Sequence, residues 1–174
     1  MNKVLGSWSG MRKYLESEMI ADSLKNKVRY GCTEYVGMDG CRIFELVLDG
    51  IQLKRFSWET VNSYFIERGY KNESNLAGIQ KYWNEFWECM DKYPMEARTE
   101  YTDNEFAEAL DFYRNRPIEE SLKSSNPIIK MFVLFDRRVG KRRLGLLKSK
   151  IYEEDDWLQK VYDFRVEAEK MNES

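Results

Sequence analysis

The stretch YVGMDGCRIFELVLDGIQLKRFSWETV, residues 35–61, decides the fold of this chain. It holds two Asp-Gly dipeptides, Asp39-Gly40 and Asp49-Gly50, and each is flanked by apolar residues. Asp-Gly favours a two-residue type I′ turn, because both turn positions need a positive φ that glycine adopts at no steric cost. The stretch therefore predicts two tight hairpins, which together make a three-stranded antiparallel meander.

A two-residue turn also fixes which residues face each other across a hairpin. The first turn predicts Val36 opposite Ile43 and Cys32 opposite Val47, and the second predicts Leu48 opposite Ile51. One face of the sheet is then apolar, and we expect it to form core. Its residues are Tyr35, Phe44, Leu46, Leu48, Ile51 and Leu53.

Helical patterns flank the meander on both sides. Residues 9–23 place Met11, Leu15 and Met19 on one helical face. After the sheet, apolar periodicity, a capping box in TDNE (residues 102–105) and the cap-proline pair in NP (residues 126–127) predict further helices. We predict an α+β fold in one domain covering residues 1–174, with an N-terminal helix, the small meander, and a helical C-terminal two-thirds.

The composition excludes several kinds of site. The chain has 174 residues, a net charge of -2 and no histidine, which removes the usual general base at neutral pH and most zinc and iron ligands. We therefore assign no catalytic, cofactor-binding or metal-binding residue and expect no cofactor. The three cysteines are an odd number without a CxxC pair, and we expect reduced thiols. With no signal peptide and no long apolar run, we expect a cytoplasmic protein without membrane contact.

The positive charge is concentrated near the C-terminus. Residues 127–150 hold eight basic residues and one acidic residue. Such a tract is typical either of a surface that binds phosphate or nucleic acid, or of a solvated face that forms ion pairs with EEDD at residues 153–156. The candidate binding residues are Arg137, Arg138, Lys141, Arg142 and Arg143.

A second candidate lies on the other face of the predicted sheet. The expected register places Glu34, Glu45 and Lys54 in one row across the strands. Carboxylates beside a lysine resemble the site of a metal-dependent nuclease, although the (D/E)xK spacing of such sites is missing. The alternative is simple charge pairing between neighbouring strands.

A third candidate is the aromatic segment YWNEFW, residues 82–87. Trp83, Phe86 and Trp87 follow helical spacing, and we expect them to form core. The alternative is a ligand pocket or a protein-binding hot spot, since tryptophan and tyrosine are enriched in both.

Several stretches together resemble a family of small uncharacterised bacterial proteins. They are WSGMRKYLE, YVGMDGCRIFE, RFSWETVN, YWNEFW and DRRVGKRRL, and the resemblance covers roughly residues 7–169. It implies no activity, cofactor or site residue. The scattered occurrence of this family among bacteria implies accessory roles such as immunity or defence.

These observations favour a non-enzymatic, cytoplasmic protein that binds another macromolecule, most concretely another protein in an immunity- or adaptor-like role. The first alternative is nucleic-acid binding through the basic tract at residues 137–150. The second is a metal-dependent, nuclease-like enzyme built on the carboxylates of the sheet. The sequence does not indicate an oligomeric state.

Overall fold

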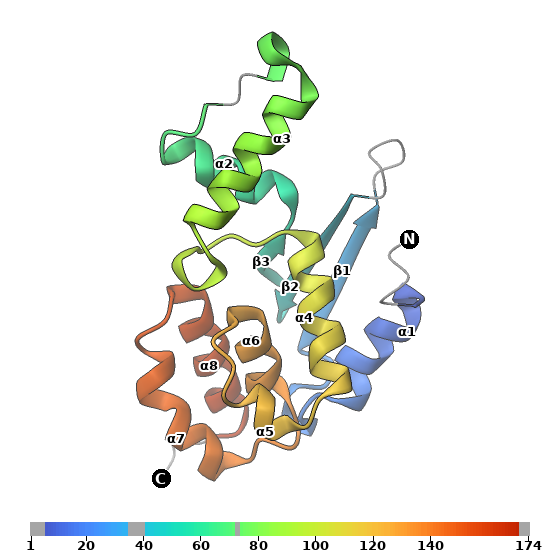
Figure 1. Cartoon of the computed structure of the whole chain (residues 1–174). Coiled ribbons are helices and arrows are strands. Elements are labelled where there is room, and N and C mark those ends of the chain that lie inside the picture. Colours follow the sequence, from blue (N-terminus) through green and yellow to red (C-terminus); the bar gives the residue numbers. More distant parts are fainter. Residues whose placement is uncertain (1–5, 35–40, 72–73, 171–174) are drawn as a thin grey trace.

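The computed structural model describes residues 6–34, 41–71 and 74–170, with the backbone alone for residues 74–79. The N-terminal helix α1 (Trp8–Lys13) precedes an antiparallel sheet of β1 (Val28–Glu34), β2 (Arg42–Leu48) and β3 (Ile51–Phe56), in the order β1-β2-β3. The remaining described elements are mostly helices (Figure 1). They are α2 (Trp58–Glu67), α3 (Ser74–Lys92), α4 (Asp103–Asn115), α5 (Ile118–Ser121), α6 (Pro127–Phe135), α7 (Lys141–Ile151) and α8 (Asp156–Ala168). The predicted α+β fold is confirmed.

The first hairpin does not have the predicted register. Glu34 faces Arg42 and Cys32 faces Phe44, so the pairing of β1 with β2 is shifted by three residues from the expected one. Ile43 accordingly faces Thr33. The predicted turn at Asp39-Gly40, together with Tyr35 and Val36, lies outside the described residues.

The second hairpin confirms its turn but not its whole register. Asp49 and Gly50 have φ values of 47° and 81°, as a type I′ turn requires, and Leu48 faces Ile51 as predicted. A register shift then occurs beside Leu46, which faces Lys54 instead of Leu53. Such a β-bulge places one extra residue in one strand, and every later side chain then points to the opposite face.

The bulge changes the composition of both faces. Lys54, expected on the other face in one row with Glu34 and Glu45, lies on the core face with Phe44, Leu46 and Phe56. Ile51, expected in the core, is 74% exposed. The predicted apolar face is therefore right for β2 and wrong for β3.

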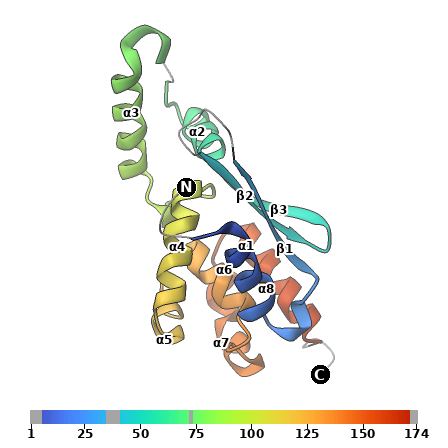
Figure 2. The same cartoon turned by 90° about the vertical axis from the view of Figure 1, so that its right-hand side faces the viewer.

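One face of the sheet packs against helices. Figure 2 shows α1, α4, α6 and α8 on the same side of the sheet. The Phe44 ring stacks on Phe106 of α4 at a centroid distance of 4.5 Å, and Phe56 meets Trp157 of α8 edge-on at 6.3 Å. These contacts belong to the larger of the two apolar clusters found in the described chain.

The N-terminal segment confirms its predicted buried face. Met11, Leu15 and Met19 are all buried, and the Ser7 hydroxyl accepts a hydrogen bond from the Gly10 N–H at the start of α1. The helix is shorter than expected, because α1 ends at Lys13 and passes into a single π-helical segment, Tyr14–Glu18. The chain then turns so that Ile20 pairs with Asp136 at the end of α6.

Helices α2 and α3 form a pair with a separate, smaller apolar cluster. Figure 1 shows this pair extending from the sheet, away from α7 and α8. The Ser57 side chain caps α2 by accepting a hydrogen bond from the Thr60 N–H. The buried members of the cluster are Val61, Tyr64, Phe65 and Phe86.

The predicted caps of the later helices are present. Thr102 and Glu105 form the capping box of α4, and the Asn126 side chain accepts from the N–H groups of Ile128 and Ile129 at the start of α6. Helix α6 ends at Phe135, and Gly140 precedes the first residue of α7.

Tyr30 provides a test of the core. Its side chain is buried, and its hydroxyl has no hydrogen-bond partner among the described residues. We expect Tyr30→Phe to leave the free energy of unfolding at pH 7 unchanged or to raise it by about 1 kcal/mol, because an unpaired buried hydroxyl is costly. Denaturant titration would measure this, and a loss above ~1 kcal/mol would contradict it.

The same variant has a predicted pH dependence. Burial raises the pKa of Tyr30 above its ordinary value of 10.0, so the folded state keeps the proton that the unfolded state loses. The free energy of unfolding is therefore unaffected by Tyr30 ionisation below pH 10 and falls as the pH rises above 10, because only the unfolded state releases the proton. Tyr30→Phe should therefore lose stability less steeply above pH 10, by up to ~1.4 kcal/mol per pH unit.

Candidate functional site

The predicted basic residues lie in the turn between α6 and α7 and in the first turn of α7. Arg137, Arg138, Lys141, Arg142 and Arg143 are all exposed. Two of them are held by other residues, since Arg143 pairs with Glu119 of α5 at 2.8 Å and Arg138 pairs with Asp136 at 2.7 Å. For Arg137, Lys141 and Arg142 the described residues provide no ion pair. The nearby EEDD segment contributes a partner to Lys130, through Glu154.

Arg138 is part of a buried network around Asp136. The Asp136 side chain is 0% exposed and accepts from the backbone N–H and the guanidinium of Arg138 and from the Tyr113 hydroxyl. Burial and the hydrogen bond to Asp136 raise the pKa of Tyr113, and the same carboxylate raises the pKa of Arg138. Arg138 therefore has a structural role that the sequence pattern did not indicate.

The charged row expected on the sheet is not formed. Glu34 faces Arg42 at the end of β1, and Glu45 pairs with Arg55 at 3.6 Å. Lys54 lies on the face of the sheet opposite to Glu45 and is 7% exposed. The shifted register of the first hairpin separates Glu34 from Glu45, and the β-bulge separates Lys54 from Glu45. The residues on which the nuclease-like hypothesis depended are therefore apart.

Lys54 instead occupies a cage of aromatic rings and oxygen atoms. Its ammonium lies 5.4 Å from the Tyr101 ring centroid and 5.5 Å from that of Trp157, and it forms an ion pair of 3.1 Å with Glu100. It also donates to the carbonyl oxygen of Thr99. Burial lowers the pKa of Lys54, while Glu100 acts in the opposite direction.

The aromatic segment of α3 is only partly core. Phe86 is buried, as predicted, but Trp83 is 37% exposed and Trp87 is 57% exposed. The prediction of a fully buried stripe is therefore wrong. Helix α2 covers the row that contains Tyr82 and Phe86, and the neighbouring row with Trp83 and Trp87 extends beyond it.

The exposed tryptophans line a groove of about 410 Å³ between α3 and α4. Its aromatic wall consists of Trp58, Trp83, Phe86 and Trp87, with Trp58 lying 6.2 Å from Trp83 between ring centroids. The indole N–H of Trp58 is buried without an acceptor among the described residues. We call this feature the α3–α4 groove.

The opposite wall of the α3–α4 groove carries carboxylates from the first turns of α4. Asp103 is buried and accepts from the backbone N–H of Arg42 at 3.0 Å. Glu105 accepts from the Arg98 guanidinium and from the Thr102 N–H. Glu108 is exposed and makes no ion pair with any described residue. Its carboxylate is therefore available to a ligand.

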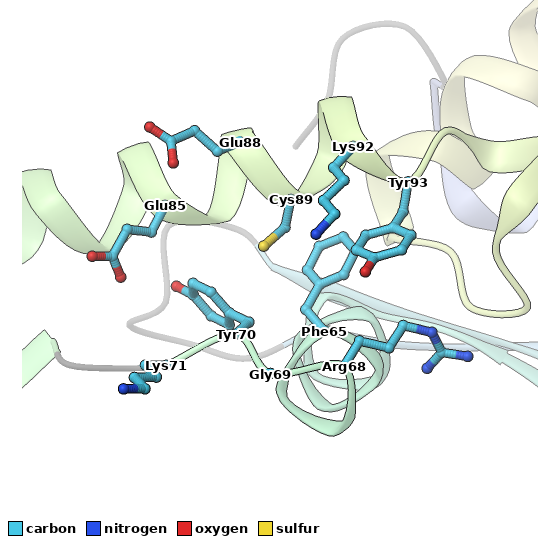
Figure 3. A pocket seen from close by; sticks show the side chains of 10 residues that line it. All are labelled: Phe65, Arg68, Gly69, Tyr70, Lys71, Glu85, Glu88, Cys89, Lys92 and Tyr93. Carbon is cyan, nitrogen blue, oxygen red and sulfur yellow. The ribbon is translucent and has the colours of Figure 1, made fainter.

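A second pocket, of about 380 Å³, lies between α3 and the end of α2. Figure 3 shows Cys89 and Lys92 pointing from α3 toward Tyr70 and Phe65. Burial raises the pKa of the Cys89 thiol, which keeps it protonated at neutral pH. A protonated thiol is a poor nucleophile, and this arrangement does not favour cysteine chemistry.

The described residues show neither a metal-binding cluster nor a membrane-spanning helix. Cys32, Cys41 and Cys89 are not joined to one another by disulfide bonds. Within residues 6–34, 41–71 and 74–170, no group of three or more Cys, Asp and Glu side chains is placed to hold a metal ion. Over the same part of the chain, none of the helices combines the length and apolar character that crossing a bilayer requires.

Comparison with known proteins identified one family. A family model described as the SF0329 protein family matches residues 7–166. This match confirms the resemblance inferred from the sequence over nearly the same residues. Searches of curated proteins and of solved structures returned no match.

The different positions of Arg138 and Arg142 give a testable contrast. We expect Arg138→Gln to lower the free energy of unfolding by about 2 kcal/mol, because it removes a charged donor from a buried carboxylate. Arg142→Gln should change it by less than ~0.5 kcal/mol, as for most exposed substitutions. Denaturant titration of both variants measures the difference, and equal effects would argue against a structural role for Arg138.

Proposed function

We propose that this chain, which belongs to the SF0329 protein family, is a cytoplasmic, non-enzymatic protein that binds another protein in an immunity- or adaptor-like role. The observation that supports this function best is the α3–α4 groove, with two tryptophans of one helical row left partly exposed. We propose that this groove is the docking site for the partner.

The energetics of protein interfaces support a binding role for these tryptophans. A small number of residues carries most of the binding energy at an interface, and tryptophan is the most enriched among them. An exposed indole costs free energy in the unbound protein, and this cost is recovered when a partner covers the ring. Trp83 and Trp87 lie one helical turn apart, so one partner segment can cover both.

Three charged side chains of the sheet and of α4 give further support for binding over catalysis. The carboxylates of Glu45 and Glu105 are engaged by Arg55 and Arg98, and Lys54 lies in the core. General acid–base catalysis needs a titratable group within hydrogen-bond reach of the substrate. These engaged and buried groups do not meet that condition, so binding is the function we favour.

Nucleic-acid binding through the basic tract is a second candidate. It is favoured by the exposure of Arg137, Lys141 and Arg142, which lie within six residues of one another and are not engaged by described carboxylates. Lys148 and Lys150 on α7 are exposed as well. Cations that are not engaged can neutralise backbone phosphates and release counterions.

The leading proposal predicts the effect of removing one indole. In nuclease-treated lysate of the source organism, a protein retained by the full chain should bind Trp87→Ala at least tenfold more weakly, as expected for a hot-spot residue. Leu146→Ala is the matched control, because Leu146 is an exposed apolar residue on α7, outside the groove. Its binding should be unchanged. Equal retention by both variants would count against the groove as the docking site.

The second candidate predicts a strong dependence on salt. Binding to a short DNA duplex should weaken roughly a hundredfold between 50 and 200 mM salt if about four phosphates are contacted. The double variant Arg137→Glu, Arg142→Glu should bind more weakly and show a shallower salt dependence. Fluorescence anisotropy measures both quantities, and a salt-independent affinity would reject this candidate.

A further inference from the structure

We infer that the α3–α4 groove takes a basic segment of a partner protein, with an arginine or lysine side chain lying on Trp83 and Trp87 and its charged head against Glu108. This inference rests on the proposed function, because it specifies what occupies the same groove. It goes beyond that function by naming the chemistry of the ligand.

The charges that line the groove have one sign. Asp103, Glu105 and Glu108 all belong to its α4 wall, and among its described lining residues none is a lysine or arginine. Glu105 is held by Arg98, and one oxygen of Asp103 accepts from Arg42, which leaves Glu108 as the exposed carboxylate. A positively charged side chain therefore complements the groove, whereas a phosphate or carboxylate is repelled.

The aromatic wall favours the same ligand. Cations bind over aromatic faces within about 6 Å of the ring centroid, and tryptophan is the most favourable ring. Arginine and lysine also carry long apolar stems that can cover indole surface while the head stays near solvent. A groove of about 410 Å³ lies within the range of ligand-sized sites.

A cation held between aromatic rings and a carboxylate is already present elsewhere in this chain. Lys54 lies over the rings of Tyr101 and Trp157 and pairs with Glu100. The α3–α4 groove offers the same combination of aromatic faces and a carboxylate, but its cationic component is missing from the described lining residues. We assign that component to the partner.

The position of the groove separates it from the basic tract. Figures 1 and 2 show α3 and α7 at opposite ends of the molecule. A basic partner segment bound beside α3 would therefore not meet the exposed arginines that precede and begin α7. The two surfaces can be tested independently.

The test uses the full chain and three synthetic amphipathic peptides with the same leucine pattern. Their polar positions are all arginine, all glutamine or all glutamate. Tryptophan fluorescence and calorimetry measure the dissociation constants. We expect the arginine peptide to bind at least tenfold more tightly than the glutamine peptide, and the glutamate peptide to show the weakest binding of the three.

Two protein variants locate the effect. Glu108→Lys should weaken binding of the arginine peptide at least fivefold. Glu167→Lys is the matched control, because it makes the same change of charge at an exposed position on α8 that does not line the groove, and it should leave binding unchanged. Equal weakening by both variants would show an effect of net charge only and would overturn the inference.

The remaining outcomes distinguish this inference from the proposed function. If the arginine and glutamine peptides bind equally well and both lose affinity with Trp87→Ala, the groove is a docking site but not one for cations. If the arginine peptide binds without any dependence on Trp83 or Trp87, the inference is wrong. Retention of the cellular partner by Trp87→Ala then decides the proposed function separately.

Discussion

The buried carboxylate of Asp136 holds together parts of the chain that are far apart in sequence. The carboxylate accepts hydrogen bonds from Tyr113 of α4 and from Arg138. The backbone of Asp136 also pairs with Ile20 of the N-terminal segment. Arg165 of α8 donates to the carbonyl oxygens of Leu134, Phe135, Asp136 and Val139 around the end of α6. The last carbonyl groups of a helix have no hydrogen-bond donor within the helix, and the Arg165 guanidinium provides the donors here. The Asp136 carboxylate is tolerated away from water because Arg138 and Tyr113 donate hydrogen bonds to its two oxygen atoms.

The sequence predicted the local features of the fold because neighbouring residues determine them. The caps at Thr102 and Asn126 and the Asp49-Gly50 turn each depend on a few adjacent side chains. The register of the sheet was predicted less well. A bulge beside Leu46 gives the second hairpin two registers, and no single turn residue marks its position. Its effect is large, because it moves Lys54 from the expected polar row into the core.

The candidate site could be predicted only in part, for a related reason. Helical spacing showed that Trp83, Phe86 and Trp87 form an apolar stripe, but it could not show how much of the stripe a second helix covers. Likewise, the basic tract was evident in the sequence, whereas the residues that engage it were not all nearby. Arg143 is paired by Glu119, more than twenty positions earlier in the chain. Exposure and pairing are properties of the tertiary structure.

The α3–α4 groove lies between two helices that belong to different apolar clusters. Its tryptophan wall belongs to α3, whose Phe86 is part of the smaller cluster, and its carboxylate wall belongs to α4, whose Phe106 is part of the larger one. The link between the clusters includes the hydrogen bond from the Ser57 N–H to the Tyr101 carbonyl, at the start of α2. A partner segment that contacts both walls would therefore join two separately packed parts of the protein.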